Sequence, residues 1–228
     1  MALVTIKGGK ATIETTRLIL REAQENDLED MHKMFGDEEV MRYWSTAPHT
    51  KEAQTKKYLD GMIAVPCNGI LDFIIVLKPT GNSIGKLGIW CKDPSNPEVG
   101  FMLARAHWNK GYMAEAMTVW LEYLWSTNCE QLVNGKYAGA HECNGDSGAL
   151  DNLQASEGSN GVQNGGMETY RGRRIERVVA DADPRNEACL GVLRKFGFKE
   201  TGRAEKTFET HLGWCDSVYF ELQRPRTE

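Results

Sequence analysis

Hydrophobic and polar positions along the chain predict strands in its first half. Residues 16–22 alternate between polar and apolar side chains, and short apolar runs follow at residues 73–77, 83–90 and 98–103. Alternation, or a short apolar run bounded by Pro, Gly or Asn, is typical of strands. Because only turn-rich segments separate the three later runs, they predict a meander of three antiparallel strands.

Apolar residues at helical spacing predict three helices before residue 127. Asp27 is placed to cap a helix over residues 28–35, and Thr50 to cap a second helix that reaches about residue 62. A third helix spans residues 113–125, and its apolar side chains share one face: Met113, Ala116, Met117, Trp120, Leu121 and Leu124. Such a face packs on a sheet more often than it contacts a cofactor, so we interpret it as core.

The C-terminal part predicts three strands and one further helix. The turn at residues 183–186 ends in Asn186, which is placed to cap a helix that stops at Gly197. Strands are expected at residues 175–180, 199–208 and 215–223. This order of elements predicts an α+β fold with a mixed sheet, formed as a single domain over residues 1–228.

One long segment lacks any such pattern. Gly, Asn, Ser and Asp dominate at about residues 127–170, where apolar residues are isolated. Such a segment buries too little surface to offset its chain entropy, so we expect a flexible insertion there. A surface connection tolerates it, since the cost of loop closure grows only logarithmically with length.

Charge and cysteine usage narrow the range of partners. The formal charge of −5 and a pI of about 5.6 argue against nucleic acid as a partner. No apolar run reaches the roughly 18 residues that span a bilayer, and no signal peptide follows Met1. The six cysteines include no C-x-x-C pair, and the spacing of Cys129, His141 and Cys143 fits no standard zinc site. A cytoplasmic protein with reduced thiols and no metal is expected.

The first candidate for chemistry is the turn that precedes the third helix, at residues 108–116. A glycine turn at a helix N-terminus presents unpaired backbone N–H groups and the positive end of the helix dipole, which suits a diphosphate. Gly111 lets the backbone approach such an anion closely. By itself the turn is equally well explained as a plain helix cap.

This segment resembles the acetyl-CoA motif of the GNAT superfamily, and in particular the Trp-Gly-Lys-Gly-Tyr-x-Thr-Glu-Ala form of its RimJ/RimL-like branch. Lys110, Gly111, Tyr112, Glu115 and Ala116 agree with that form. Asn109 stands where that form has a Gly, and Met113 stands where the general GNAT pattern, Arg/Gln-x-x-Gly-x-Gly/Ala, has a Gly or Ala. Asn tolerates left-handed backbone angles, so we expect the turn to survive.

Other segments resemble the same branch and fall in the same order. Residues 16–21 are similar to its opening strand, and residues 99–101 to the strand before the cofactor turn. Residues 183–198 are similar to its late Asn-x-x-Ser…Val-Leu-x-Lys-x-Gly-Phe segment, and Trp214 and Asp216 to its penultimate strand. The resemblance covers most of the chain outside residues 127–170.

The resemblance implies a GNAT fold whose central, mostly antiparallel sheet splays after Phe101. It implies acetyl-CoA as cosubstrate, held between the Gly111 turn and the Asn186 helix, with the pantetheine arm along the 101–103 strand edge and an oxyanion on a backbone N–H there. The residues expected to bind the cofactor are Phe101, Met102, Leu103, Trp108, Asn109, Lys110, Gly111, Tyr112, Met113, Ala114, Asn186 and Cys189.

Acyl transfer to an amine needs a base, because a free primary amine has a pKa of about 10. Glu98 stands where GNAT enzymes often place a carboxylate base, although a solvated carboxylate at the start of a strand is an equally good interpretation. Asp216 is a second candidate, for which a structural hydrogen bond or a substrate contact is the stronger interpretation.

The departing thiolate can be assisted by an acid. Cys189 stands where the RimL-like pattern carries a Ser proposed for that role, and the alternative interpretation is a small buried hydrophobe. Tyr219 is a weaker candidate acid. The four catalytic candidates are therefore Glu98, Asp216, Cys189 and Tyr219.

The sequence thus predicts an acetyl-CoA-dependent N-acetyltransferase that acts on a primary amine, either a small molecule or a protein or peptide N-terminus. The alternative is a catalytically silent acyl-CoA-binding or protein-interaction module of the same fold, in which the 127–170 segment could serve as the interaction segment. The sequence leaves open whether the protein is a homodimer.

Overall fold

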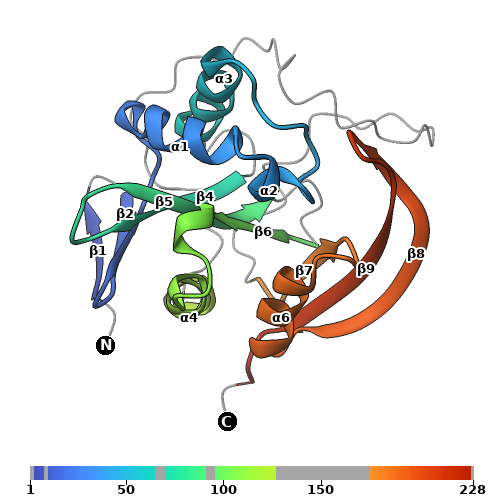
Figure 1. Ribbon diagram of the computed structural model, residues 1–228. Coiled ribbons are helices and arrows are strands. Elements are labelled where there is room, and N and C mark those ends of the chain that lie inside the picture. The colour runs from blue at the N-terminus through green and yellow to red at the C-terminus, as the bar shows by residue number, and fades with distance from the viewer. Residues whose placement is uncertain (1–2, 8–9, 65–69, 91–95, 127–174, 227–228) are drawn as a thin grey trace, which may run out of the picture.

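The computed structural model describes residues 3–7, 10–64, 70–90, 96–126 and 175–226. Their strands form one sheet of nine, in the order β1-β2-β3-β4-β5-β6-β7-β9-β8 (Figure 1). Neighbouring strands are antiparallel except β6 and β7, which are parallel. The bounds are β1 Leu3–Lys7, β2 Lys10–Glu14, β3 Leu18–Arg21, β4 Ile70–Leu77, β5 Ser83–Trp90, β6 Glu98–Leu103, β7 Arg177–Ala182, β8 Lys199–Thr210 and β9 Gly213–Gln223. The predicted α+β fold with a mixed sheet is confirmed.

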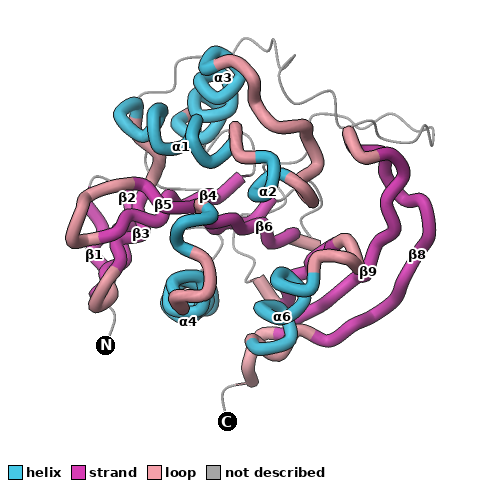
Figure 2. The backbone as a smooth tube through the Cα atoms, viewed as in Figure 1, coloured by secondary structure: helices cyan, strands magenta, loops and turns pink. Residues whose placement is uncertain are grey.

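Helices cover both faces of the sheet (Figures 1 and 2). One face carries α1 (Leu28–Phe35), α2 (Glu38–Met41) and α3 (Glu52–Ile63), and the other carries α4 (Tyr112–Ser126) and α6 (Glu187–Lys195). Short 3-10 turns lie at Glu25–Asp27 and Arg105–His107. The predicted insertion at about residues 127–170 lies outside the described residues, as do Cys67, Cys91, Cys129, His141 and Cys143.

Side chains on the two faces of the sheet enter two separate cores. Val99 and Leu103 of β6 pack with α4 and α6, whereas Met102 packs with α1 and α3. Successive side chains of a strand point to opposite faces, so Glu98 and Gly100 face the side of α1–α3 with Met102. The α4 face predicted as core is buried, with Trp120 fully enclosed, which confirms that interpretation.

Of two predicted helix caps, Asp27 is the N-cap residue of α1 but makes no side-chain cap bond, and Thr50 is wrong. Asp27 precedes α1, but its carboxylate accepts hydrogen bonds from the Arg21 guanidinium at 2.7 and 2.8 Å, the Gln24 N–H and the Ser83 hydroxyl, and makes no cap bond to α1. Lys51 rather than Thr50 is the N-cap of α3. Both residues lie near a helix start, but tertiary contacts decide which groups satisfy the first N–H groups.

A buried ion pair stabilises the core beneath α3. Lys86 of β5 donates to Asp72 of β4 and to the Tyr58 hydroxyl of α3, both at 2.7 Å. The two charged side chains are only 4% and 9% exposed. Although burial acts to lower it, the Asp72 carboxylate raises the pKa of Lys86 above its ordinary value. The Lys86 ammonium also lies 5.4 Å from the centre of the Trp44 ring.

Candidate active site

The two parallel strands, β6 and β7, separate directly after the first residue of β6. Across the described residues of both strands, the register of β6 and β7 consists of one pair, Glu98 with Val179, where the Val179 N–H donates to the Pro97 carbonyl at 2.9 Å. The expected separation after Phe101 is therefore corrected to a point directly after Glu98. Beyond it, Phe101, Met102 and Leu103 pair only with β5 and leave the β7 side of their backbone open.

The turn after β6 has the conformation that an anion site needs. Asn109 and Gly111 have positive φ angles of 58° and 78°, and α4 begins directly afterwards at Tyr112. The Trp108 indole donates to the Leu103 carbonyl at 2.7 Å and ties the turn to the end of β6. The first N–H groups of α4, from Tyr112, Met113 and Ala114, lack helical partners by position. The expectation that Asn109 adopts a left-handed backbone is confirmed.

A second helix start follows the other separating strand. Asn186 caps α6, because its side-chain oxygen accepts the Cys189 N–H at 3.1 Å. Gly197 ends the helix with a φ of 83°. The helices α4 and α6, which follow the two separated strands, lie on the same face of the sheet (Figure 1).

Cys189 lies in the first turn of α6 against the core. Burial raises the pKa of its thiol to about 12. The thiol is therefore protonated at neutral pH, but proton transfer from it to a thiolate of ordinary pKa, about 8.5, is uphill. Its geometry suits a hydrogen-bond donor better than a full proton donor.

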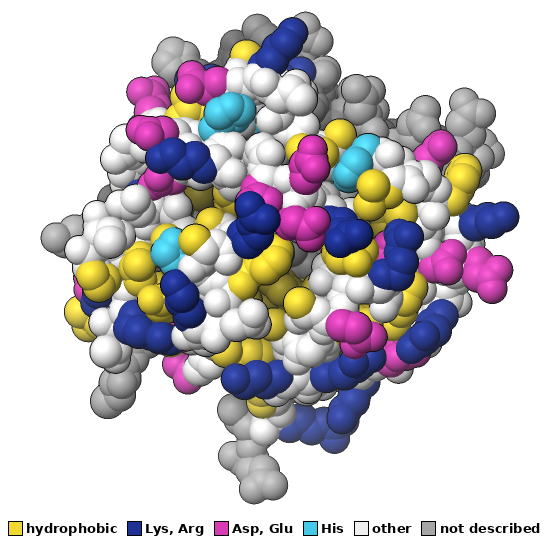
Figure 3. All heavy atoms as spheres, viewed as in Figure 1, with side chains coloured by type: hydrophobic (Ala, Val, Ile, Leu, Met, Phe, Trp, Pro, Cys, Tyr) yellow, Lys and Arg dark blue, Asp and Glu magenta, His cyan; other side chains and the backbone are white. Residues whose placement is uncertain are grey.

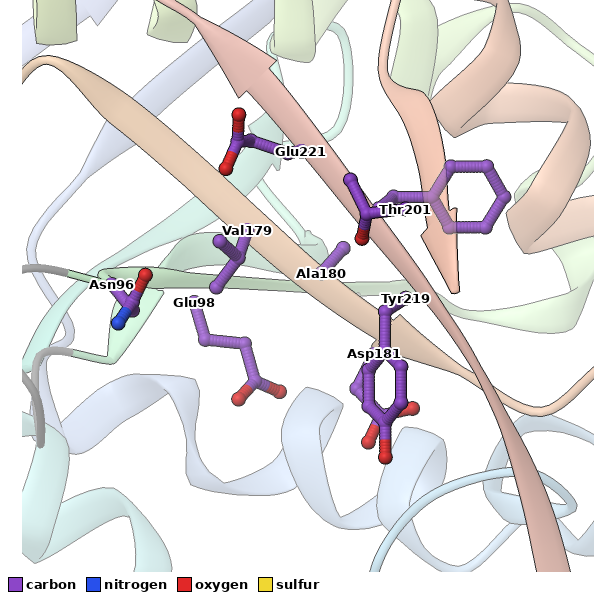
Figure 4. A pocket seen from close by; sticks show the side chains of 9 residues that line it. Asn96, Glu98, Val179, Ala180, Asp181, Thr201, Tyr219 and Glu221 are labelled. Carbon is purple, nitrogen blue, oxygen red and sulfur yellow. The ribbon is translucent and has the colours of Figure 1, made fainter. Parts of the chain in front are cut away.

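Glu98 lines a hollow of about 320 Å³ on the α1–α3 side of the sheet (Figure 4). The lining also includes Asp181 of β7 and Tyr219 of β9, which are cross-strand partners. In Figure 4 the carboxylates of Glu98 and Asp181 and the hydroxyl of Tyr219 point the same way, away from the strands. Three chemically active groups from three strands therefore share one hollow.

The electrostatics of this hollow favour a base near neutral pH. Burial, and next the nearby Asp181 carboxylate, raise the pKa of Glu98 to about 7. Burial also raises the pKa of Asp181, although a hydrogen bond from Ser217 opposes that shift. A carboxylate with a pKa of about 7 can accept a proton and return it under physiological conditions.

Asp216 is not brought into this hollow. It belongs to the other alternating set of β9, facing away from Tyr219, and its carboxylate accepts the N–H of Lys206 at 2.9 Å. Lys206 has a positive φ of 52° at an irregularity in β8, so Asp216 supports the backbone there. Among the predicted catalytic residues, the structure brings together Glu98 and Tyr219, with Cys189 on the opposite face of the sheet.

Sequence reasoning missed two residues at this site. Asp181 falls between the strand predicted to end at residue 180 and the turn predicted to begin at residue 183, whereas β7 continues to Ala182. Trp44, just after α2, lies over Gly100, and its ring comes within 3.8 Å of the position that a side chain at Gly100 would take. A longer alternation count across residues 177–182 could have found Asp181, but nothing in the sequence indicates Trp44.

The surface over the separated strands is suited to a long ligand with an anionic end. Hydrophobic side chains form the floor of a central hollow on this face, and both basic (Lys, Arg) and acidic (Asp, Glu) side chains lie around its rim (Figure 3). Among the described residues, no helix is long and apolar enough to cross a membrane, and no cluster of His, Cys, Asp and Glu could hold a metal ion.

Comparison with known proteins identifies the family. A model of the acetyltransferase (GNAT) domain matches residues 17–199. The chain belongs to the GNAT acetyltransferase family. The predicted GNAT fold, the acyltransferase class and acetyl-CoA as the donor that this family uses are thereby confirmed.

Relatives and solved structures agree with this family. The N-acetyltransferase p20 of Bacillus licheniformis is 30% identical over 115 residues, which is 49% of this chain and 65% of p20, just under two thirds of its length. The ribosomal-protein-S5-alanine acetyltransferase of Vibrio fischeri superposes with a TM-score of 0.65 at 16% identity, covering 95% of this chain and 98% of its own. The spermidine N-acetyltransferase of Vibrio cholerae, solved with CoA and spermine, gives 0.62 at 15% identity, covering 92% and 97%.

The left-handed angle of Asn109 in this GNAT turn leads to a first prediction. Asn109→Gly should leave acetyl-CoA affinity within about twofold of the wild type, because Gly adopts the same φ without strain. Asn109→Val should weaken affinity about tenfold, since a β-branched residue is strongly disfavoured there and would distort the turn. Isothermal titration with acetyl-CoA measures both, and equal affinities for the two variants would contradict the prediction.

Proposed function

We propose that this protein transfers the acetyl group of acetyl-CoA to a primary amine, with the donor bound in the gap between β6 and β7 and the amine bound in the Glu98 hollow. The observation that carries the proposal is that, among the described residues, β6 and β7 pair only at Glu98 and Val179, so the Glu98 carboxylate lies where the two strands separate. Donor and acceptor would then meet from opposite faces of the sheet.

The described residues fit the donor. The N–H groups that begin α4 and the left-handed turn at Asn109 and Gly111 would hold the diphosphate. The open backbone of residues 101–103 would pair with the amides of the pantetheine arm, and one N–H there would hold the thioester oxygen. Asn186 and Cys189 at the start of α6 would complete the other wall. The bound donor supplies an activated thioester carbonyl.

Glu98 would act as the general base. An amine enters the hollow mostly as an ammonium ion, and its nitrogen can attack only after it loses a proton. With its pKa raised to about 7, the Glu98 carboxylate can take that proton directly or through one water molecule. The neutral amine then forms the N–C bond and gives a tetrahedral intermediate. When this collapses the C–S bond breaks, and the departing thiolate takes the second proton that the nitrogen gives up.

Tyr219 is the second group that we assign to the acceptor side. Its hydroxyl lies beside Asp181 at the hollow, where it can orient the amine or donate a proton (Figure 4). Cys189 would contribute a hydrogen bond to the leaving sulfur from the other face. The carboxylates of Glu98 and Asp181 favour acceptors that carry positive charge, which includes small amines and protein N-termini.

We also propose that the protein belongs to the RimJ/RimL-like branch of the family and that it works in the cytoplasm. Residues 108–116 and 183–198 support membership of the RimJ/RimL-like branch, and the branch member from Vibrio fischeri superposes over nearly the whole chain. The free thiols of Cys189 and Cys215 suit a reducing cytoplasm, where acetyl-CoA is available.

A thiol-release assay with an amine panel tests the function. The panel contains spermidine, a monoamine and peptides that begin with Ala or Ser, and isothermal titration measures acetyl-CoA binding in parallel. We expect micromolar binding and thiol release with at least one amine, fastest for one that carries a second positive charge. Acetyl-CoA binding without thiol release on any amine would support the catalytically silent module instead. If acetyl-CoA does not bind, both the acetyltransferase and the silent acyl-CoA-binding module are wrong.

A further inference from the structure

Arg17, just before β3, reaches across to the turn that begins α4. Its Nε donates to the Glu115 Oε2 at 2.6 Å, and its Nη1 donates to the Lys110 carbonyl at 3.0 Å. Its guanidinium carbon lies 4.5 Å from the centre of the Tyr112 ring. One side chain from a segment distant in sequence therefore contacts the end of the turn and two residues in the first part of α4.

Glu115 in turn holds Arg17 in place. Its Oε1 accepts the Thr15 hydroxyl at 2.5 Å and the Arg17 backbone N–H at 3.1 Å. Although burial acts to raise it, these hydrogen bonds and that from the Arg17 side chain lower the pKa of Glu115, which keeps the carboxylate ionised. Both oxygens of Glu115 are thus occupied in fixing the position of Arg17.

The contact with the Lys110 carbonyl has a geometric consequence. In a trans peptide the C=O of one residue and the N–H of the next point in opposite directions. Because Arg17 holds the Lys110 carbonyl toward β3, the Gly111 N–H is directed away from β3. The same contact draws a carbonyl dipole, which would repel an anion, away from the turn.

We propose that Arg17 is a positioning residue that fixes the Lys110–Gly111 peptide so that its N–H faces the diphosphate of the donor. This role rests on the proposed function, because it presupposes a diphosphate at the α4 turn. The alternative is a purely structural ion pair between β3 and α4. That pair is 42% exposed on the arginine side, so on its own it contributes little to stability.

A comparison of two donors separates these roles. S-acetylpantetheine carries the thioester without the diphosphate and the adenosine 3′-phosphate attached to it. The ratio of kcat/KM for acetyl-CoA to that for S-acetylpantetheine therefore reports on recognition of this nucleotide part, in which the diphosphate is the group proposed to lie at the α4 turn. In Arg17→Met this ratio should fall about tenfold, the loss expected for one misdirected hydrogen bond to a charged group. At saturating acetyl-CoA, kcat should be unchanged. Arg17→Lys should recover part of the ratio.

Arg203→Met is the matched control, because it also removes an exposed arginine, which pairs with Glu200 on β8 far along the chain from the turn. Its donor ratio should equal that of the wild type. If Arg17→Met fails to fold in a thermal melt, Glu115→Gln tests the same point by releasing Arg17. An unchanged ratio, or an equal loss with both donors, would overturn the role of Arg17. A wild type without preference for acetyl-CoA would instead overturn the diphosphate site itself.

Discussion

Replacing Glu98 with glutamine should lower kcat with the best amine by about 10²–10⁴, the range in which general bases contribute. The substitution keeps the shape of the side chain but removes its capacity to accept a proton. Steady-state thiol release across pH 5.5–9 measures the effect. In the wild type kcat/KM should rise with pH through a midpoint near 7, because Glu98 acts only when it is deprotonated.

That acidic limb should be absent from the pH profile of Glu98→Gln. Asp216→Asn is the matched control, since Asp216 does not line the hollow, and its profile should retain the limb. A wild-type profile in Glu98→Gln would remove Glu98 as the base. A lost limb in Asp216→Asn alone would transfer the role to Asp216.

Glu98→Gln should also change the stability of the folded protein in the absence of substrate. The pKa of Glu98 is raised in the folded protein, from its ordinary 4.5 to about 7, so the folded state binds this proton more tightly than the unfolded state. Wild-type stability is therefore lost as pH rises from about 4.5 to 7. Glu98→Gln should avoid that loss. The difference in free energy of unfolding between Glu98→Gln and the wild type should therefore shift by about 1–3 kcal/mol in favour of the variant between pH 4 and pH 8. Thermal melts at the two pH values measure this difference.

Lys86→Met should lower the free energy of unfolding by about 3–5 kcal/mol, because it leaves the Asp72 carboxylate buried without its partner. Urea denaturation at pH 7 measures the change. The double variant Lys86→Met/Asp72→Asn should recover a substantial part of the loss, since no uncompensated charge then remains.

An exposed pair gives the contrast. Arg203→Met breaks a pair whose two side chains are 59% and 38% exposed, and should cost less than about 1 kcal/mol. If Lys86→Met also lowered the free energy of unfolding by less than about 1 kcal/mol, water would reach Asp72 in solution and the pair would not be buried.

Elements whose signal is local could be predicted from the sequence. The bounds of β5 and β6 are those of their apolar runs, and α4 and α6 follow their apolar faces and their caps. The sequence did not predict the β1–β2 hairpin, because each strand is only five residues long and Ile13 is fully buried only once β3 lies beside it. Burial created by a neighbouring strand leaves no local pattern.

The site shows the same division. The Gly111 turn, Asn186 and Glu98 lie in contiguous motifs, so their positions could be predicted. The contact between Arg17 and Glu115 joins residues 98 positions apart, and the opposition of Asp181 and Tyr219 depends on the pairing of β7 with β9. Both facts follow from which strands become neighbours, which side-chain periodicity does not specify.

Among the described residues, β6 and β7 share one register pair, Glu98 with Val179. This pairing joins two portions of the chain that each carry part of the proposed active site. The chain before residue 127 carries the α4 turn and Glu98, the proposed base, while the chain after residue 174 carries Asn186, Asp181 and Tyr219. Each portion alone therefore has an incomplete donor site and an incomplete acceptor site. The proposed acyl transfer therefore needs both portions. Among the described residues their strands share one register pair, and α4 and α6 pack in one core.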